Sequence, residues 1–259
     1  DVALIEFGKP VIALCDGIVM GGGAGLAQHS QHIVMTETTR FAMPESAIGL
    51  FPDVGASLFL GRCPKSVARL MGMTGHIVGA VDCLLLGLAT AQVPSDSLAC
   101  LKKKLLLCNA EEIYSIIKQF QCDMGQSSLA SQRQLIDHIF ADGTVESMRD
   151  RAARLAENMP HNKLLGGIVK AFETRCPLSI KLFERLLVET NHLIDPRAAI
   201  ELDFHLALRM TKRADFAEGV RAIAIDKDHS PQWTPNSLEA VTETMLDAVF
   251  DRSGLPSLR

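Results

Sequence analysis

Short apolar runs alternate with turn signals in the first third of the sequence. Val11–Cys15 and His32–Thr36 are compact apolar runs that predict buried β-strands. Between them, the consecutive glycines Gly21–Gly23 precede a helix-like segment. Further along, Pro64–Met73 and Val81–Leu88 carry apolar residues at helical spacing. This alternation predicts an α/β fold for residues 1–95.

Helical patterns dominate the rest of the chain. Residues 96–121 and 129–159 are predicted to be helical, and residues 121–128 between them are polar and predict a flexible loop. A long helix is predicted to open at Cys176-Pro177, and residues 198–214 form another amphipathic pattern. We therefore expect two parts, an α/β core over residues 1–95 and a helical region over residues 96–259 that packs on it.

Composition and charge narrow the class of protein. The 259 residues are 47% hydrophobic and 22% charged, with a net charge of −4, which is typical of a globular protein and unfavourable for nucleic-acid binding. The apolar runs are shorter than the roughly 18 residues of a membrane span, so no membrane partner is expected. Seven scattered cysteines without a CxxC pair predict reduced thiols in an intracellular compartment and no metal site.

Three positions in the first part could support carbonyl chemistry. Gly22 lies where a strand leads through glycines into a helix, a geometry that leaves backbone N–H groups free to bind an oxyanion. Glu45 and Asp53 follow in segments rich in proline and glycine. Each also has a structural interpretation: a tight turn for Gly22, a helix-starting carboxylate for Glu45 and an Asx turn for Asp53.

Three motifs carry a resemblance to a known family. They are DGIVMGGGAGL (Asp16–Leu26), FAMPESAIGLFPDVG (Phe41–Gly55) and FAEGVRAIAIDKDHSPQW (Phe216–Trp233). Together and in this order they resemble the crotonase, or enoyl-CoA hydratase/isomerase, superfamily, and within it the branch of 3-hydroxyisobutyryl-CoA hydrolases. The resemblance implies a spiral core of ββα repeats, followed by a mostly helical C-terminal region.

The resemblance also implies roles for single residues. The glycine that matches Gly22 donates its N–H to the thioester oxygen, and a catalytic glutamate stands at Glu45. In the hydrolase branch, Asp53 contacts the 3-hydroxyl group of the substrate or assists proton transfer. Gly25 stands where hydratases carry a second catalytic glutamate, so hydration is disfavoured. Glu45 would act either as a general base or as a nucleophile that forms an anhydride, and the sequence does not decide between these two.

The resemblance finally implies an acyl-CoA substrate and no cofactor, because CoA enters as part of the substrate. Crotonases carry a further segment before the position of Asp1, which supplies a second oxyanion donor and a CoA-binding loop, so we expect a fragment or a truncated protein. The sequence does not decide whether the protein forms a homo-oligomer. We expect a cytoplasmic location if the protein is bacterial and a mitochondrial one if it is eukaryotic. An enoyl-CoA hydratase or isomerase and a non-catalytic structural subunit are the alternative functions.

Overall fold

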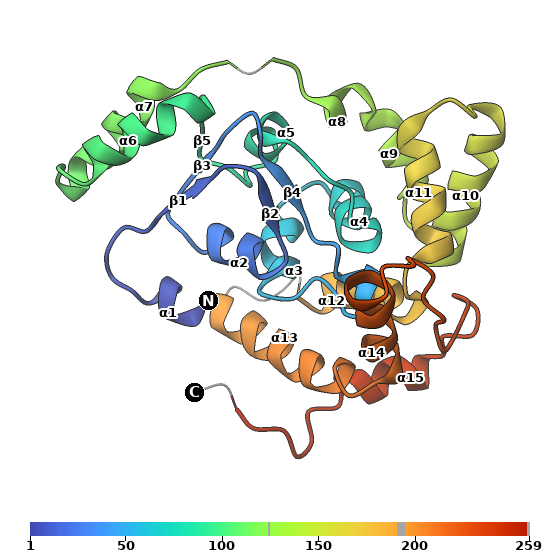
Figure 1. The fold of residues 1–259 in the computed structure, drawn as a ribbon. Helices are drawn as coiled ribbons and strands as arrows, with labels where there is room; N and C mark the ends of the chain where they lie inside the picture. Colours follow the sequence, from blue (N-terminus) through green and yellow to red (C-terminus); the bar gives the residue numbers. More distant parts are fainter. Residues whose placement is uncertain (124, 191–194, 258–259) are drawn as a thin grey trace. The chain divides into compact units, whose positions relative to one another are not determined.

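A computed structural model of the chain describes residues 1–123, 125–190 and 195–257, and it contains two compact units (Figure 1). The first unit comprises Asp1–Ala42 and Ile77–Arg133, and the second comprises Met43–His76 and Gln134–Arg259. Met124, inside the loop predicted over residues 121–128, lies outside the described residues. The predicted division of the chain at residue 95 stays a prediction.

Parallel strands form the centre of the first unit. The predicted strands are confirmed, and the chain pairs them in two small parallel sheets of order β1-β3-β5 and β2-β4. Val34 of β3 pairs with Leu14 on one side and Ala91 on the other, and it has no exposed surface. The strands are β1 (Ile12–Cys15), β2 (Ile18–Met20), β3 (His32–Met35), β4 (Arg40–Ala42) and β5 (Ala91–Gln92).

The corner after β1 shows how successive repeats stack. The carboxylate of Asp16 accepts hydrogen bonds from the hydroxyl groups of Thr36 and Thr38, at 2.6 Å each, and from the hydroxyl of Ser95 at 3.0 Å. These hydrogen bonds lower the pKa of Asp16. The corner of one repeat thus binds the corners of the next two, which is the arrangement expected of a spiral of ββα repeats.

Two helices cover β3 and β5 in the first unit. The helical pattern predicted over residues 96–121 is divided into α6 (Leu98–Leu105) and α7 (Ile113–Phe120). The break occurs because Asn109 starts a new turn, where its N–H donates to Glu112 at 2.9 Å. The apolar faces of the two helices bury a common cluster with the sheet, made of Val34, Ala91, Val93, Leu101, Ile113 and Ile117. The remaining elements of this unit are α1 (Val2–Ile5), α2 (Gly22–Gln28), α5 (Ala80–Leu85), η2 (Ser95–Ser97), η3 (Ala110–Glu112) and α8 (Ser128–Ser131).

The second unit is helical and is organised around α12 (Pro177–Thr190). The predicted proline start is confirmed, and Leu178, Leu182 and Leu186 recur every fourth residue along one buried face. The helix contacts α3 and α4, and Figure 1 shows α10 and α11 side by side as an antiparallel pair. The other elements are η1 (Glu45–Ile48), α3 (Ala56–Gly61), α4 (Lys65–Thr74), α9 (Arg133–Ile139), α10 (Val145–Asn158), α11 (Lys163–Thr174), α13 (Pro196–Met210), α14 (Ala214–Val220), the π-helical η4 (Arg221–Ile225) and α15 (Glu243–Phe250).

Two of the predicted helical segments end differently in the structure. The pattern over residues 129–159 is interrupted before α10, because Gly143 has a φ of 138° and Thr144 caps the new helix by accepting from the N–H of Ser147. The pattern over residues 198–214 ends at Met210, and α14 begins separately at Ala214. No helix in the described part of the chain is long and apolar enough to cross a membrane.

The close approach of α14 to η1 gives a first prediction. A Cβ atom added at Gly219 would lie 2.4–2.6 Å from the backbone of Ile48. Gly219→Ala should therefore force the two elements apart and lower the free energy of unfolding by about 1–3 kcal/mol. Urea denaturation measures this change. Gly166→Ala in α11 is the matched control, because a Cβ there meets no atom within 4 Å, and it should be neutral or stabilising. Equal effects of the two substitutions would contradict the close approach.

Candidate active site

Glu45 is a buried carboxylate at the start of η1. Its side chain is 5% exposed, and its Oε2 atom has no hydrogen-bond partner among the described residues. Burial raises the pKa of Glu45 from 4.5 to about 8, and the charge of nearby Asp53 acts in the same direction. A carboxyl group with this pKa can accept a proton near neutral pH. Glu45 does start a helical turn, which is the structural role considered for it in the sequence analysis. That role does not give its Oε2 atom a hydrogen-bond partner among the described residues.

Asp53 precedes a turn in an unusual backbone conformation. Val54 has a φ of 55° and Gly55 a φ of 79°, both in the left-handed region. A β-branched residue is rare there, because its side chain is close to the backbone, and the conformation costs about 1–3 kcal/mol. The chain turns back at once, with the N–H of Ala56 donating to the carbonyl of Asp53 at 2.9 Å. Burial raises the pKa of Asp53 as well.

A third carboxyl group, on α13, restrains this turn. Asp203 is 2% exposed, and its Oδ2 atom accepts a hydrogen bond from the N–H of Gly55 at 2.7 Å. Its Oδ1 atom has no partner among the described residues. Burial raises the pKa of Asp203 well above its usual value, and the charge of Asp53 raises it further. Both effects favour the protonated form of Asp203.

Asp203 is absent from the site residues predicted above, although the sequence carries a signal for it. Asp203 stands four residues after Ala199 and three before Leu206, and both of these lie on the buried face of α13. A carboxylate on the apolar face of an amphipathic helix is seldom a solvated surface group. That position alone could have marked it as a buried acid.

The second unit thus gathers three carboxyl groups with raised pKa values. No arginine or lysine in the described part of this unit forms an ion pair with Glu45, Asp53 or Asp203. Buried acids that lack cationic partners bind their protons more tightly than exposed acids do, and such groups cluster at functional sites. The described residues contain no group of three or more His, Cys, Asp or Glu side chains that could hold a metal ion.

Gly22 lies in the first unit, as the first residue of α2. Gly21 before it has φ 54° and ψ −128°, a conformation essentially restricted to glycine. The first intrahelical bonds are donated by Ala24 and Gly25 to the carbonyl of Gly21, so within the described residues the N–H of Gly22 makes no backbone bond. The role of this N–H as an oxyanion donor stays a prediction. The grouping of Gly22 with Glu45 and Asp53 stays a prediction.

The stacked ββα repeats and the buried glutamate that follows them are features of the crotonase fold. The sequence model of the enoyl-CoA hydratase/isomerase family matches residues 1–250, and the chain belongs to this family. The chain is 37% identical over 260 residues to "Probable 3-hydroxyisobutyryl-CoA hydrolase 2" of Arabidopsis thaliana, covering 97% of this chain and 68% of the relative. It is 34% identical to "3-hydroxyisobutyryl-CoA hydrolase, mitochondrial" of Homo sapiens, covering 97% and 66%. The chain therefore spans about two thirds of the length of these relatives.

Solved structures confirm the fold. An enoyl-CoA hydratase from Rhodobacter sphaeroides matches with a TM-score of 0.87 and 30% identity, covering 100% of this chain and 73% of that protein. A carnitinyl-CoA dehydratase from Mycobacterium thermoresistibile matches with a TM-score of 0.87 and 26% identity, covering 98% and 71%. The predicted α/β class and crotonase-like core are both confirmed.

Proposed function

We propose that the protein hydrolyses the thioester bond of 3-hydroxyisobutyryl-CoA, giving 3-hydroxyisobutyrate and CoA in valine breakdown. The observation that carries this proposal is the buried pair of Glu45 and Asp53, in which one carboxylate oxygen of Glu45 has no hydrogen-bond partner among the described residues. The names of the curated relatives support it. Gly25, where hydratases carry a second glutamate, favours hydrolysis over hydration.

In the proposed reaction, the N–H of Gly22 donates to the thioester oxygen and stabilises the oxyanion that forms there. The Glu45 carboxylate either takes a proton from the attacking water or attacks the acyl carbon itself, forming an anhydride that water then cleaves. Both routes release CoA as the thiol and need no metal or redox group. Single turnover in ¹⁸O-labelled water identifies the anhydride route when water attacks the Glu45 carbonyl, because the bridging oxygen from Glu45 then leaves unlabelled in the product and ¹⁸O enters Glu45.

Asp53 is proposed to contact the 3-hydroxyl group of the substrate. Asp203 is proposed to be a positioning residue that holds Asp53 in place. The hydrogen bond from Gly55 to Asp203 fixes the turn next to Asp53. Fixing this turn holds the carboxylate in one place, and misplacement of a substrate-contacting group lowers the rate.

Two substitutions at Asp203 test this positioning role. Asp203→Asn keeps an oxygen acceptor for the N–H of Gly55 and should retain most of the activity. Asp203→Leu leaves that buried N–H unsatisfied and should lower the unfolding free energy by about 1–3 kcal/mol. We expect the Leu variant to raise the KM for 3-hydroxyisobutyryl-CoA and to raise it less for an acyl-CoA without the 3-hydroxyl. An equal rise for both substrates would contradict the positioning role.

The activity itself is tested by two parallel assays on the full protein. Release of CoA from 3-hydroxyisobutyryl-CoA is followed with a thiol reagent, and hydration of crotonyl-CoA is followed by loss of its double-bond absorbance. We expect release without hydration. Hydration without release would identify a hydratase, and a folded protein that turns over neither substrate would favour the non-catalytic alternative.

A further inference from the structure

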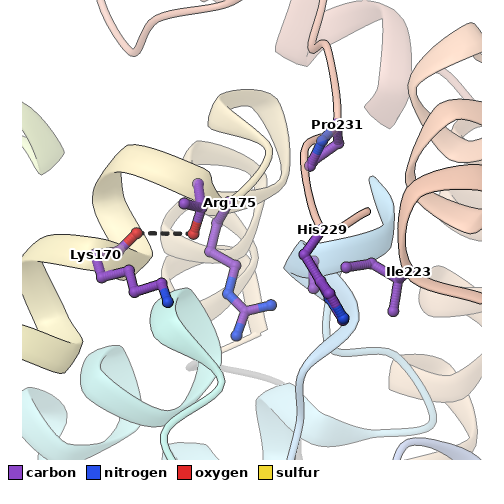
Figure 2. Close-up of a pocket in the computed structure, with 7 residues that line it drawn as sticks. Lys170, Arg175, Ile223, His229 and Pro231 are labelled. Carbon is purple, nitrogen blue, oxygen red and sulfur yellow. Dashed lines mark hydrogen bonds between the residues drawn. The ribbon is translucent and has the colours of Figure 1, made fainter. Parts of the chain in front are cut away.

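A pocket in the helical unit has a cationic wall. Its volume is about 220 Å³, and it is lined by residues of η1, the end of α11, η4 and the loop after η4 (Figure 2). Lys170, Arg175 and His229 supply three nitrogen-bearing side chains, and Figure 2 shows them extending toward the same side of the pocket. None of the described residues that line it is acidic.

Arg175 is the unusual member of this wall. It follows α11 directly and is half-buried, and its Nε atom is buried without a hydrogen-bond partner among the described residues. Burial lowers its pKa, and no ion pair offsets this effect in the part of the chain that the structure describes. Leaving a guanidinium desolvated and unpaired is costly, so buried arginines are normally bound to an anion or a carbonyl.

The surrounding groups do not supply that missing partner. Asp226 and Asp228, in the loop that leads to the pocket, are both bound by Arg221, at 2.7 and 2.6 Å. The hydroxyl of Thr174 donates to the carbonyl of Lys170 at 2.7 Å. Nη2 of Arg175 lies near Gly75 at the C-terminal end of α4, where the helix dipole gives partial negative charge. No carbonyl group there accepts a hydrogen bond from Arg175 within the described residues.

The backbone also holds one wall residue in a rare conformation. His229 has a φ of 54°, and its N–H donates to the carbonyl of Ala222 in η4 at 3.1 Å. A non-glycine residue in the left-handed region is uncommon outside turns and functional sites. This geometry presents the imidazole to the pocket across from Arg175.

We propose that this pocket binds a phosphoryl group. The planar fork of Arg175 can donate two parallel hydrogen bonds to one tetrahedral oxyanion, while Lys170 supplies a second positive charge and His229 a further N–H donor. Two full positive charges, on a wall whose described lining residues include no acid, match a phosphate dianion better than a singly charged carboxylate. This proposal depends on the pocket alone and does not require the hydrolase activity proposed above.

Calorimetric titration of the full protein with inorganic phosphate tests the proposal, with chloride of equal ionic strength as the blank. We expect one saturable site whose affinity falls at least 10-fold in Arg175→Gln and several-fold in Lys170→Gln. Arg175→Lys, which keeps the charge but loses the fork, should fall between the native protein and Arg175→Gln. The matched control is Arg154→Gln on α10, an exposed arginine outside the pocket, which should bind as the native protein does.

Circular dichroism of each variant verifies that it is folded before titration. Absence of saturable phosphate binding by the native protein would overturn the proposal, as would unchanged affinity in both folded Arg175 variants. Competition between inorganic phosphate and CoA or dephospho-CoA then identifies the molecule that carries the phosphoryl group. Displacement of phosphate by CoA but not by dephospho-CoA identifies the 3′-phosphate of CoA as the occupant, whereas no displacement by either identifies the free ion. The readout is binding, so it stays valid if the thioesterase assays fail.

Discussion

Glu45→Gln is expected to lower the rate of CoA release from 3-hydroxyisobutyryl-CoA by about 10²–10⁴-fold, the range that a positioned general base contributes. The amide has the size of the carboxyl group but neither accepts a proton from water nor attacks an acyl carbon. The native rate should also rise with pH and level off above about 8, because burial holds the pKa of Glu45 at about 8 and the reactive form is the carboxylate.

The control for this substitution is Glu157→Gln, at an exposed position of α10. It makes the same chemical change outside the site and should leave both the rate and its pH profile unchanged. Stopped assays with a thiol reagent between pH 6 and 9.5 would give both quantities. A loss of less than about 10-fold in a folded Glu45→Gln protein would mean that another group performs the proton transfer.

The same carboxyl group should make the protein less stable as the pH rises. The pKa of Glu45 is raised from 4.5 to about 8 on folding, so between these values the unfolded chain releases the proton while the folded protein keeps it. The contribution of Glu45 is therefore fully present below pH 4.5 and is lost as the pH rises through 8. At about 1.4 kcal/mol per pKa unit, the loss is on the order of 5 kcal/mol.

Glu45→Gln removes this contribution, so the inactive variant should be more stable than the native protein at pH 9 and should show a flatter decline between pH 5 and 9. Asp53 and Asp203 act in the same direction, because their pKa values are raised too, and they should leave a residual slope. Urea denaturation across this range measures the unfolding free energy of both proteins. Parallel pH curves for the two proteins would show that Glu45 ionises as freely in the folded state as in the unfolded chain.

The elements that sequence could predict are those with a strong local pattern. The strands of the first unit are continuous apolar runs, and Pro177 marks the start of α12. By contrast, α11 was not predicted as a separate helix, because Gly166 and Gly167 weaken its local preference. Its burial of Leu165, Ile168, Ala171 and Phe172 compensates for that weakness, and this is tertiary information.

In the candidate site, too, local sequence motifs reveal some residues, whereas others depend on tertiary contacts. Glu45 and Asp53 stand close together in the sequence and could be found from one motif. The residue that restrains their loop, Asp203, lies on a different helix, and nothing near Asp53 in the sequence points to it. The left-handed conformation of Val54 was equally hidden, because valine by itself favours extended backbone.

The bond between Gly55 and Asp203 also bears on the order in which the protein matures during synthesis. The two residues are 148 positions apart, so the turn beside Asp53 leaves the ribosome long before the side chain that restrains it. Contacts of such long range form late and slowly compared with local ones. A nascent chain that ends before α13 has already acquired both Glu45 and Asp53 but not the bond that fixes their loop. On the proposed positioning role, the turn beside Asp53 is fixed only after α13 has been made, so shortened translation products should lack this restraint.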